Sequence, residues 1–91
     1  MREKVLIFDG KDLHEIGAEY FFQHPVIRDL KKDDVLHIYQ HTMFLNYSAE
    51  QNEEDKIKME KGSNILEQMV LDMYGKKEGQ PHIDRVNYMI T

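Results

Sequence analysis

A proline-free stretch with a helical pattern, residues 49–74, constrains the fold of this chain more than any other feature. Its apolar positions, together with one glycine, keep a single helical phase: Met59, Gly62, Leu66, Met69, Val70 and Met73. Ser48 and Gln51 have the spacing of an N-terminal capping box, and Gly75 stands where a glycine would end the helix. We therefore predict one unbroken helix about 39 Å long, since each residue adds ~1.5 Å.

Gly62 lies inside this predicted helix, where a glycine costs about 1 kcal/mol relative to alanine. A close contact with a packed neighbour would compensate for that cost, because a residue without a Cβ lets another segment approach the helix. We expect a larger side chain at this position to overpack the contact and to lower the stability of the fold.

Both ends of the chain are expected to form strands. Residues 4–8 are a short apolar run that the turn-forming pair Asp9-Gly10 terminates, which is typical of a buried strand. Near the C-terminus, Val86, Tyr88 and Ile90 alternate with other side chains and predict a closing strand. The polar segment 76–82 before it is expected to be a loop.

Two further helices are predicted between the first strand and the long helix. Over residues 12–23, Asp12 and Glu15 have capping-box spacing, and the pattern ends before Pro25. A second helix is expected over residues 33–47. Its central part, 35–44, also alternates like a strand, so a strand there stays open as an alternative.

These elements predict an α+β fold, mostly helical, that forms a single domain over residues 1–91. The expected order is strand, helix, helix, long helix, strand (β-α-α-α-β). The terminal strands would pair in a small sheet, and a helical hairpin that includes the long helix, 49–74, would pack on that sheet.

The composition limits the chemistry of the chain. Seventeen acidic and twelve basic residues give a net charge of −5, which argues against general binding to nucleic acid. The chain has no cysteine, which excludes disulfides, thiolate nucleophiles and cysteine-ligated zinc. Because a membrane span needs about 20 apolar residues, we expect a cytoplasmic protein without membrane contact, and we expect no cofactor.

His37 and His41 are the candidate metal ligands, because residues four apart share one face of a helix. A site would need a third ligand from His14, His24, His82 or a carboxylate elsewhere in the fold. Two histidines do not make a metal site, so surface or partly buried histidines are the favoured interpretation. No catalytic residue is predicted.

The candidate partner-binding residues are acidic residues and methionines of the long helix and one aromatic side chain: Glu50, Glu53, Glu54, Met59, Met69, Met73 and Phe22. The acidic residues complement the positive end of the helix dipole, or they attract a basic partner. Methionines furnish adaptable binding surfaces, although packing in the core is their favoured role. One of the three consecutive aromatic residues 20–22 is expected to face solvent or a partner.

From these features we expect a non-catalytic protein that binds another protein through a helical face. It would be a regulator, inhibitor or assembly factor, of a kind that phages and mobile elements often carry. One alternative is a metal-binding module or metal-dependent enzyme that uses His37 and His41. Another is a DNA-binding regulator in which Lys31 and Lys32 contact phosphates.

A homodimer is also expected. Residues 5–8 put apolar side chains on both faces of a short strand, and the long helix exceeds what two shorter helices can cover. A two-fold interface would cover both surfaces at once.

Overall fold

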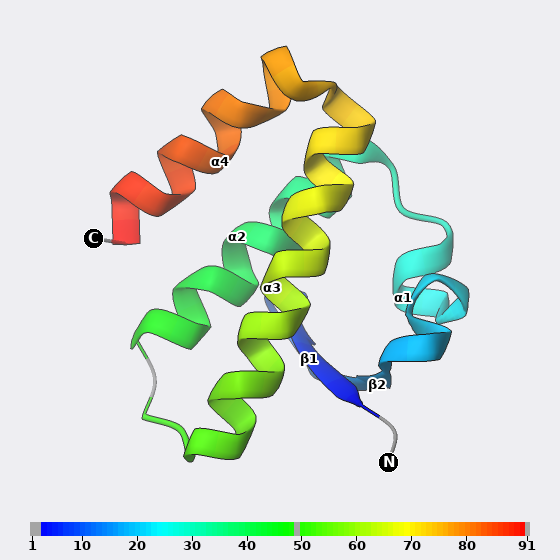
Figure 1. Ribbon diagram of the computed structural model, residues 1–91, viewed down its shortest axis with the longest axis vertical. Coiled ribbons are helices and arrows are strands. Elements are labelled where there is room, and N and C mark those ends of the chain that lie inside the picture. The colour runs from blue at the N-terminus through cyan, green and yellow to red at the C-terminus, as the bar shows by residue number, and fades with distance from the viewer. Residues whose placement is uncertain (1–2, 49, 91) are drawn as a thin grey trace.

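The computed structural model describes residues 3–48 and 50–90 of the chain. Its elements, in chain order, are strands β1 (Lys4–Phe8) and β2 (Leu13–Gly17), the 3-10 helix η1 (Ala18–Gln23), and helices α1 (Pro25–Arg28), α2 (Lys32–Ser48), α3 (Glu53–Tyr74) and α4 (Lys76–Ile90). The predicted class is confirmed, because the fold is α+β and mostly helical. The predicted order is wrong, since the sheet is a hairpin near the N-terminus and not a pair of terminal strands (Figure 1).

The β1–β2 hairpin is antiparallel, with Val5 opposite Ile16. Asp9 builds its turn, because Asp9 Oδ1 accepts hydrogen bonds from the backbone amides of Lys11 (2.8 Å) and Asp12 (2.7 Å). A short aspartate side chain that binds its own backbone two residues further on favours a turn. The Asp9-Gly10 pair therefore ends β1 as predicted, and it also returns the chain alongside β1.

The predicted helix over residues 12–23 is wrong, because this segment forms β2 and η1. Neither residue of the expected capping box caps a helix. The amide of Asp12 donates to Asp9, and the carboxylate of Glu15 lies 2.9 Å from the Nζ of Lys58 on α3. Within η1 only the central aromatic residue, Phe21, is buried.

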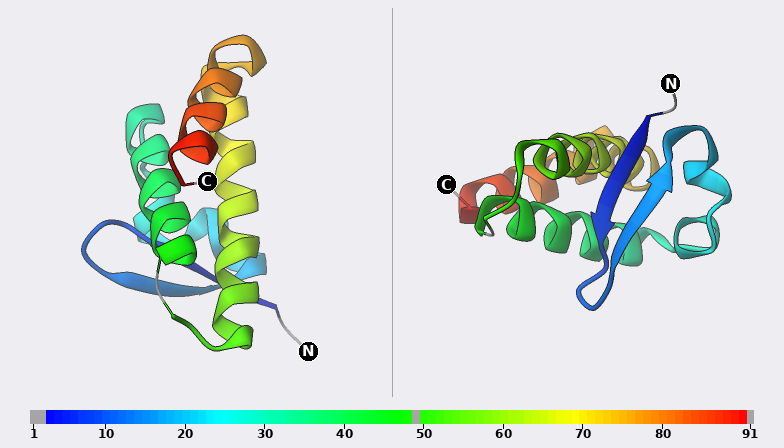
Figure 2. Two further views of the ribbon diagram at one scale, coloured as in Figure 1. Left: turned by 90° about the vertical axis from the view of Figure 1, so that its left-hand side faces the viewer. Right: turned by 90° about the horizontal axis from the view of Figure 1, so that it is seen from below.

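Helices α2 and α3 cover the edge of β1 that does not pair with β2, and the hairpin runs across both helices (Figure 2). The Thr42 hydroxyl on α2 accepts from the Phe8 amide (2.9 Å) and donates to the Phe8 carbonyl (3.2 Å). On α3, Gly62 lies against the Leu6 carbonyl, where any Cβ would overlap the oxygen and stand 3.0 Å from Cγ2 of Ile7. The predicted close contact at Gly62 is confirmed, and its neighbour is the backbone of β1.

Residues 35–44 are helical, which excludes the strand alternative for this part of α2. The long helix, α3, begins at Glu53, because Asn52 Oδ1 accepts from the amide of Asp55 at 2.7 Å. The expected start at residue 49 with a Ser48 cap is therefore wrong. At the other end, α3 stops at Tyr74 as predicted, and Gly75 follows with a positive φ of 85°.

The predicted loop and closing strand in the last 16 residues are wrong, because Lys76–Ile90 forms α4. Gly79 permits this packing: a Cβ there would lie only 3.2 Å from the Cα of Leu71. Gly79, Ile83 and Val86 form the buried stripe of α4 at steps of four and three, so its period is helical. The apparent alternation fails because Tyr88 is 83% exposed.

One hydrophobic core joins the hairpin, η1 and all four α-helices: Val5, Ile7, Ile16, Phe21, Ile27, Val35, Ile38, Tyr39, Leu66, Val70, Ile83 and Val86. Leu6 is buried as well, so both faces of β1 are covered within the chain. Helix α3 packs against β1, α2 and α4. In the described residues, the uncovered strand face that suggested a homodimer is therefore not present. The oligomeric state itself stays a prediction.

Candidate functional site

A groove of about 510 Å³ lies between residues 39–47 of α2, residues 56–67 of α3 and Asn87 in the last turn of α4. Helix α4 folds back after Gly75 and runs obliquely to α2 and α3 (Figure 1). It contributes Asn87 to the lining of the groove. The volume is within the range of ligand pockets, ~300–1,000 Å³. We therefore treat this groove as the candidate functional site.

The floor of the groove contains a buried tyrosine beside a carboxylate. Tyr39 is 1% exposed, and its hydroxyl donates to Glu67 Oε1 over a long 3.4 Å. Burial, followed by the negative charge of Glu67, raises the pKa of Tyr39 to about 12. The phenol therefore remains a neutral hydrogen-bond donor throughout the physiological pH range.

Two polar atoms of the groove have no hydrogen-bond partner in the described part of the chain, and both are buried. They are Ser63 Oγ on α3 and Asn46 Oδ1 on α2. Ser63 as a whole is only 3% exposed. A buried polar atom without a partner costs about 1–3 kcal/mol, which makes these two atoms candidates for contact with a ligand.

The rim of the groove combines an aromatic ring with charges and amides. Tyr47, at the end of α2, is 62% exposed. Lys56, Glu60 and Asn64 follow along the exposed side of α3. On α4, Asn87 uses its amide nitrogen to hold the Ile83 carbonyl at 3.0 Å. The groove is thus polar, with few apolar side chains.

The structure separates the predicted partner-binding residues into surface and core. Glu53 and Glu54 are exposed in the first turn of α3, and Glu50 is exposed just before it. Glu54 Oε1 lies 3.4 Å from Lys58 Nζ as an i, i+4 pair. Phe22 is 62% exposed, Met73 is also exposed, and Met69 packs partly against the core. The prediction that Met59 binds a partner is wrong, because Met59 is only 1% exposed and is buried inside the fold.

The two candidate metal ligands lie on one face of α2 as predicted, with ring centroids 4.2 Å apart. His37 is exposed, whereas His41 is partly buried beneath the turn: a Cβ at Gly10 would lie 3.0 Å from its Nε2. In the described part of the chain, no three side chains of the metal-binding types are placed to share an ion. The imidazole of His41 has a packing role in this arrangement.

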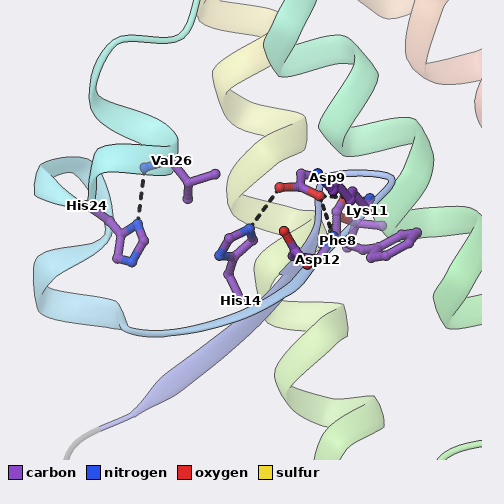
Figure 3. A network of polar contacts seen from close by, with 8 residues as sticks. Phe8, Asp9, Lys11, Asp12, His14, His24 and Val26 are labelled. Atoms are coloured by element: carbon purple, nitrogen blue, oxygen red, sulfur yellow. Dashed lines mark hydrogen bonds and ion pairs between the residues drawn. The ribbon is translucent and has the colours of Figure 1, made fainter.

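A second polar network joins the hairpin turn to the segment before α1 (Figure 3). His14 Nε2 lies 2.8 Å from Asp9 Oδ2, and the rings of His14 and His24 meet edge to face at 6.0 Å. The backbone amide of Asp12 and then the His14 side chain lower the pKa of Asp9 to about 2. His24 Nδ1 in turn accepts from the amide of Val26, at the start of α1. This network fixes the turn and the entry into α1.

The groove residues were not among those predicted, although the sequence holds one signal for them. Ser63 is a polar residue directly after Gly62, on a helix whose neighbouring buried positions are apolar. Such a residue needs a partner, which the helix does not supply. Tyr39, Asn46 and Glu67 gave no comparable signal, because each also fits an ordinary amphipathic helix.

None of the helices in the described part of the chain is both long and apolar enough to cross a membrane. Comparison with models of protein families, with curated proteins and with solved structures found no match to this chain.

Proposed function

We propose that this chain is a small acidic interaction protein, without catalytic activity of its own, that binds another protein through the groove between α2, α3 and α4. The groove carries the proposal, because it holds two hydrogen-bonding atoms, Ser63 Oγ and Asn46 Oδ1, that have no partner in the part of the chain that the structure describes. A partner that supplies hydrogen bonds to them recovers part of the free energy lost by their burial. The exposed Tyr47 lines the same groove, and tyrosine is enriched among residues that dominate binding energy.

The charge of the chain favours a basic partner. The net charge is −5, and the exposed residues Glu50, Glu53 and Glu54 lie just before and in the first turn of α3, which also contains the groove residue Lys56. Complementary charge of this kind accelerates encounter and selects among partners. A regulator, inhibitor or assembly factor would act in this way, and action in the cytoplasm is part of the proposal.

The two alternative functions have less support. Lys31 and Lys32 are flanked by acidic residues, and Lys32 Nζ lies 5.2 Å from the ring centroid of Tyr74, so this segment is poorly suited to phosphates. For metal chemistry, His37 and His41 lack a third ligand among the described residues. Self-association stays a separate prediction, which light scattering tests through a mass near twice 10.9 kDa.

A matched pair of substitutions on α3 tests the proposal. Asn64 and Gln68 are both exposed neutral amides on α3, but only Asn64 lines the groove. Asn64→Trp should obstruct the groove, whereas Gln68→Trp adds the same bulk outside it. In quantitative affinity capture from host cells, we expect a partner to be recovered with the native chain and with Gln68→Trp, and to be lost with Asn64→Trp. Equal recovery with both folded variants would contradict the proposed function.

A further inference from the structure

The oxygen atoms that line the groove could accept more hydrogen bonds than the described residues donate to them. Asn46 Oδ1 has no donor among the described residues, and Ser63 Oγ, on a residue that is only 3% exposed, has no partner there either. Among the described residues, Glu67 Oε1 accepts one long hydrogen bond, of 3.4 Å, from the Tyr39 hydroxyl. The groove therefore suits a ligand that is rich in hydrogen-bond donors.

The electrostatic environment favours a positive ligand. Two carboxylates, Glu60 and Glu67, line the groove against one ammonium group, Lys56. The last turns of α2 and α4 also border it, and neither contains a basic residue in the described chain. Because the C-terminal end of a helix carries partial negative charge, the ends of α2 and α4 add to the attraction for a cation. The first turn of α3, which contains Lys56, acts in the opposite direction, and the carboxylates of Glu60 and Glu67 outnumber its one ammonium group.

From these observations we infer that the groove binds an arginine side chain presented by a basic segment of the partner. This inference rests on the proposed function and names the chemistry that the groove recognises. A guanidinium group offers five donors in one plane, so it can donate at once to a carboxylate of α3 and to the amide oxygen of Asn46 on α2. It also stacks on aromatic rings, and the exposed ring of Tyr47 stands at the rim. A lysine ammonium, with three donors and a compact charge, fits these separated acceptors less well.

The test uses two short peptides, acetyl-Gly-Arg-Gly-amide and the same peptide with citrulline in place of arginine. Citrulline keeps nearly the same shape but has no charge. In nuclear magnetic resonance titrations of the full chain, the arginine peptide should shift the side-chain amide signals of Asn46, Asn64 and Asn87. The citrulline peptide should shift them much less at the same concentration.

Charge variants of α3 test whether the affinity for the arginine peptide depends on the charges in the groove. Glu60→Gln and Glu67→Gln should each weaken binding of the arginine peptide roughly tenfold, because each removes a charged hydrogen-bond acceptor. Lys56→Gln should instead strengthen binding, because it removes the competing cation from the groove. Asp72→Asn removes a carboxylate charge from an exposed position of the same helix outside the groove, and it should leave the affinity unchanged.

The inference is overturned if neither peptide shifts these signals, if both shift them equally, or if Lys56→Gln weakens binding. Such results leave the proposed function separately testable. If Asn64→Trp abolishes capture of the partner but the groove binds the arginine and citrulline peptides equally, only the assignment of arginine as the occupant is wrong. A partner that Asn64→Trp does not displace would overturn the proposed function itself.

Discussion

Replacing Gly62 by alanine should destabilise the protein, although alanine is the better helix former. Alanine gains about 1 kcal/mol of helix propensity at an interior position. At Gly62, however, the added carbon would overlap the Leu6 carbonyl oxygen and stand 3.0 Å from Cγ2 of Ile7. β1 cannot move away easily, because β2 pairs with one edge and Thr42 holds Phe8 at the other.

Overpacking costs typically 1–3 kcal/mol, and a clash with backbone belongs at or above the upper end of that range. After the propensity gain is subtracted, we expect Gly62→Ala to lower the free energy of unfolding by about 2 kcal/mol. In a domain of this size the melting temperature should fall by roughly 8–16 °C. Gly62→Leu should be worse, since it adds three more carbon atoms to the same contact.

Gly17→Ala is the control, because Gly17 has an ordinary φ of −61° and its Cβ would meet only Cδ2 of Tyr20, at 3.4 Å. This variant should be neutral or slightly stabilising, by about 0.4–1 kcal/mol. Urea denaturation followed by circular dichroism measures both variants. An increase in stability for Gly62→Ala would refute the close packing of α3 on β1.

Two further predictions concern the turn and the core. Asp9→Asn should keep the turn but lose the ion pair with His14. The folded pKa of Asp9 is about 2, below its ordinary 3.8, so its contribution to stability is present above pH 4 and is lost as the pH falls through 2. The stability cost of Asp9→Asn, measured by thermal denaturation, should therefore shrink between pH 4 and pH 2, and a constant cost would contradict this. Met59→Ala should cost about 2–5 kcal/mol, whereas exposed Met73→Ala should stay within about 0.5 kcal/mol; equal costs in chemical denaturation would place Met59 outside the core.

The parts of the fold that follow from local chemistry were predictable from the sequence. The sequence predicts the end of α3 at Gly75, because a glycine there can terminate the helix. It also predicts the close contact at Gly62, because this interior glycine is in phase with the apolar residues. The hairpin was not predictable in the same way. β2 buries only Ile16, so its strand geometry comes from pairing with β1 and not from its own pattern. A spacing such as that of Asp12 and Glu15 does not reveal which backbone amides are already bonded.

Helix α4 and the groove depend on packing over long distances in the sequence. Gly79 and Pro81 resemble loop residues, but Gly79 is the position where α4 passes close to Leu71 on α3. The groove exists because α4 then runs obliquely to α2, which no local pattern specifies. The sequence therefore predicts a helical interaction surface without indicating the groove, and that surface stays a prediction. Its assignment of Met59 to the surface is wrong, because Met59 is buried.

Site-specific photo-crosslinking shows most directly whether the groove is the surface that binds the partner. A photoreactive amino acid placed at Asn64 would lie in the groove, and the same group placed at Gln68 would lie on α3 outside it. After irradiation in host cells, we expect a crosslinked partner from position 64 and little or none from position 68. A partner crosslinked equally from both positions, or only from position 68, would contradict it.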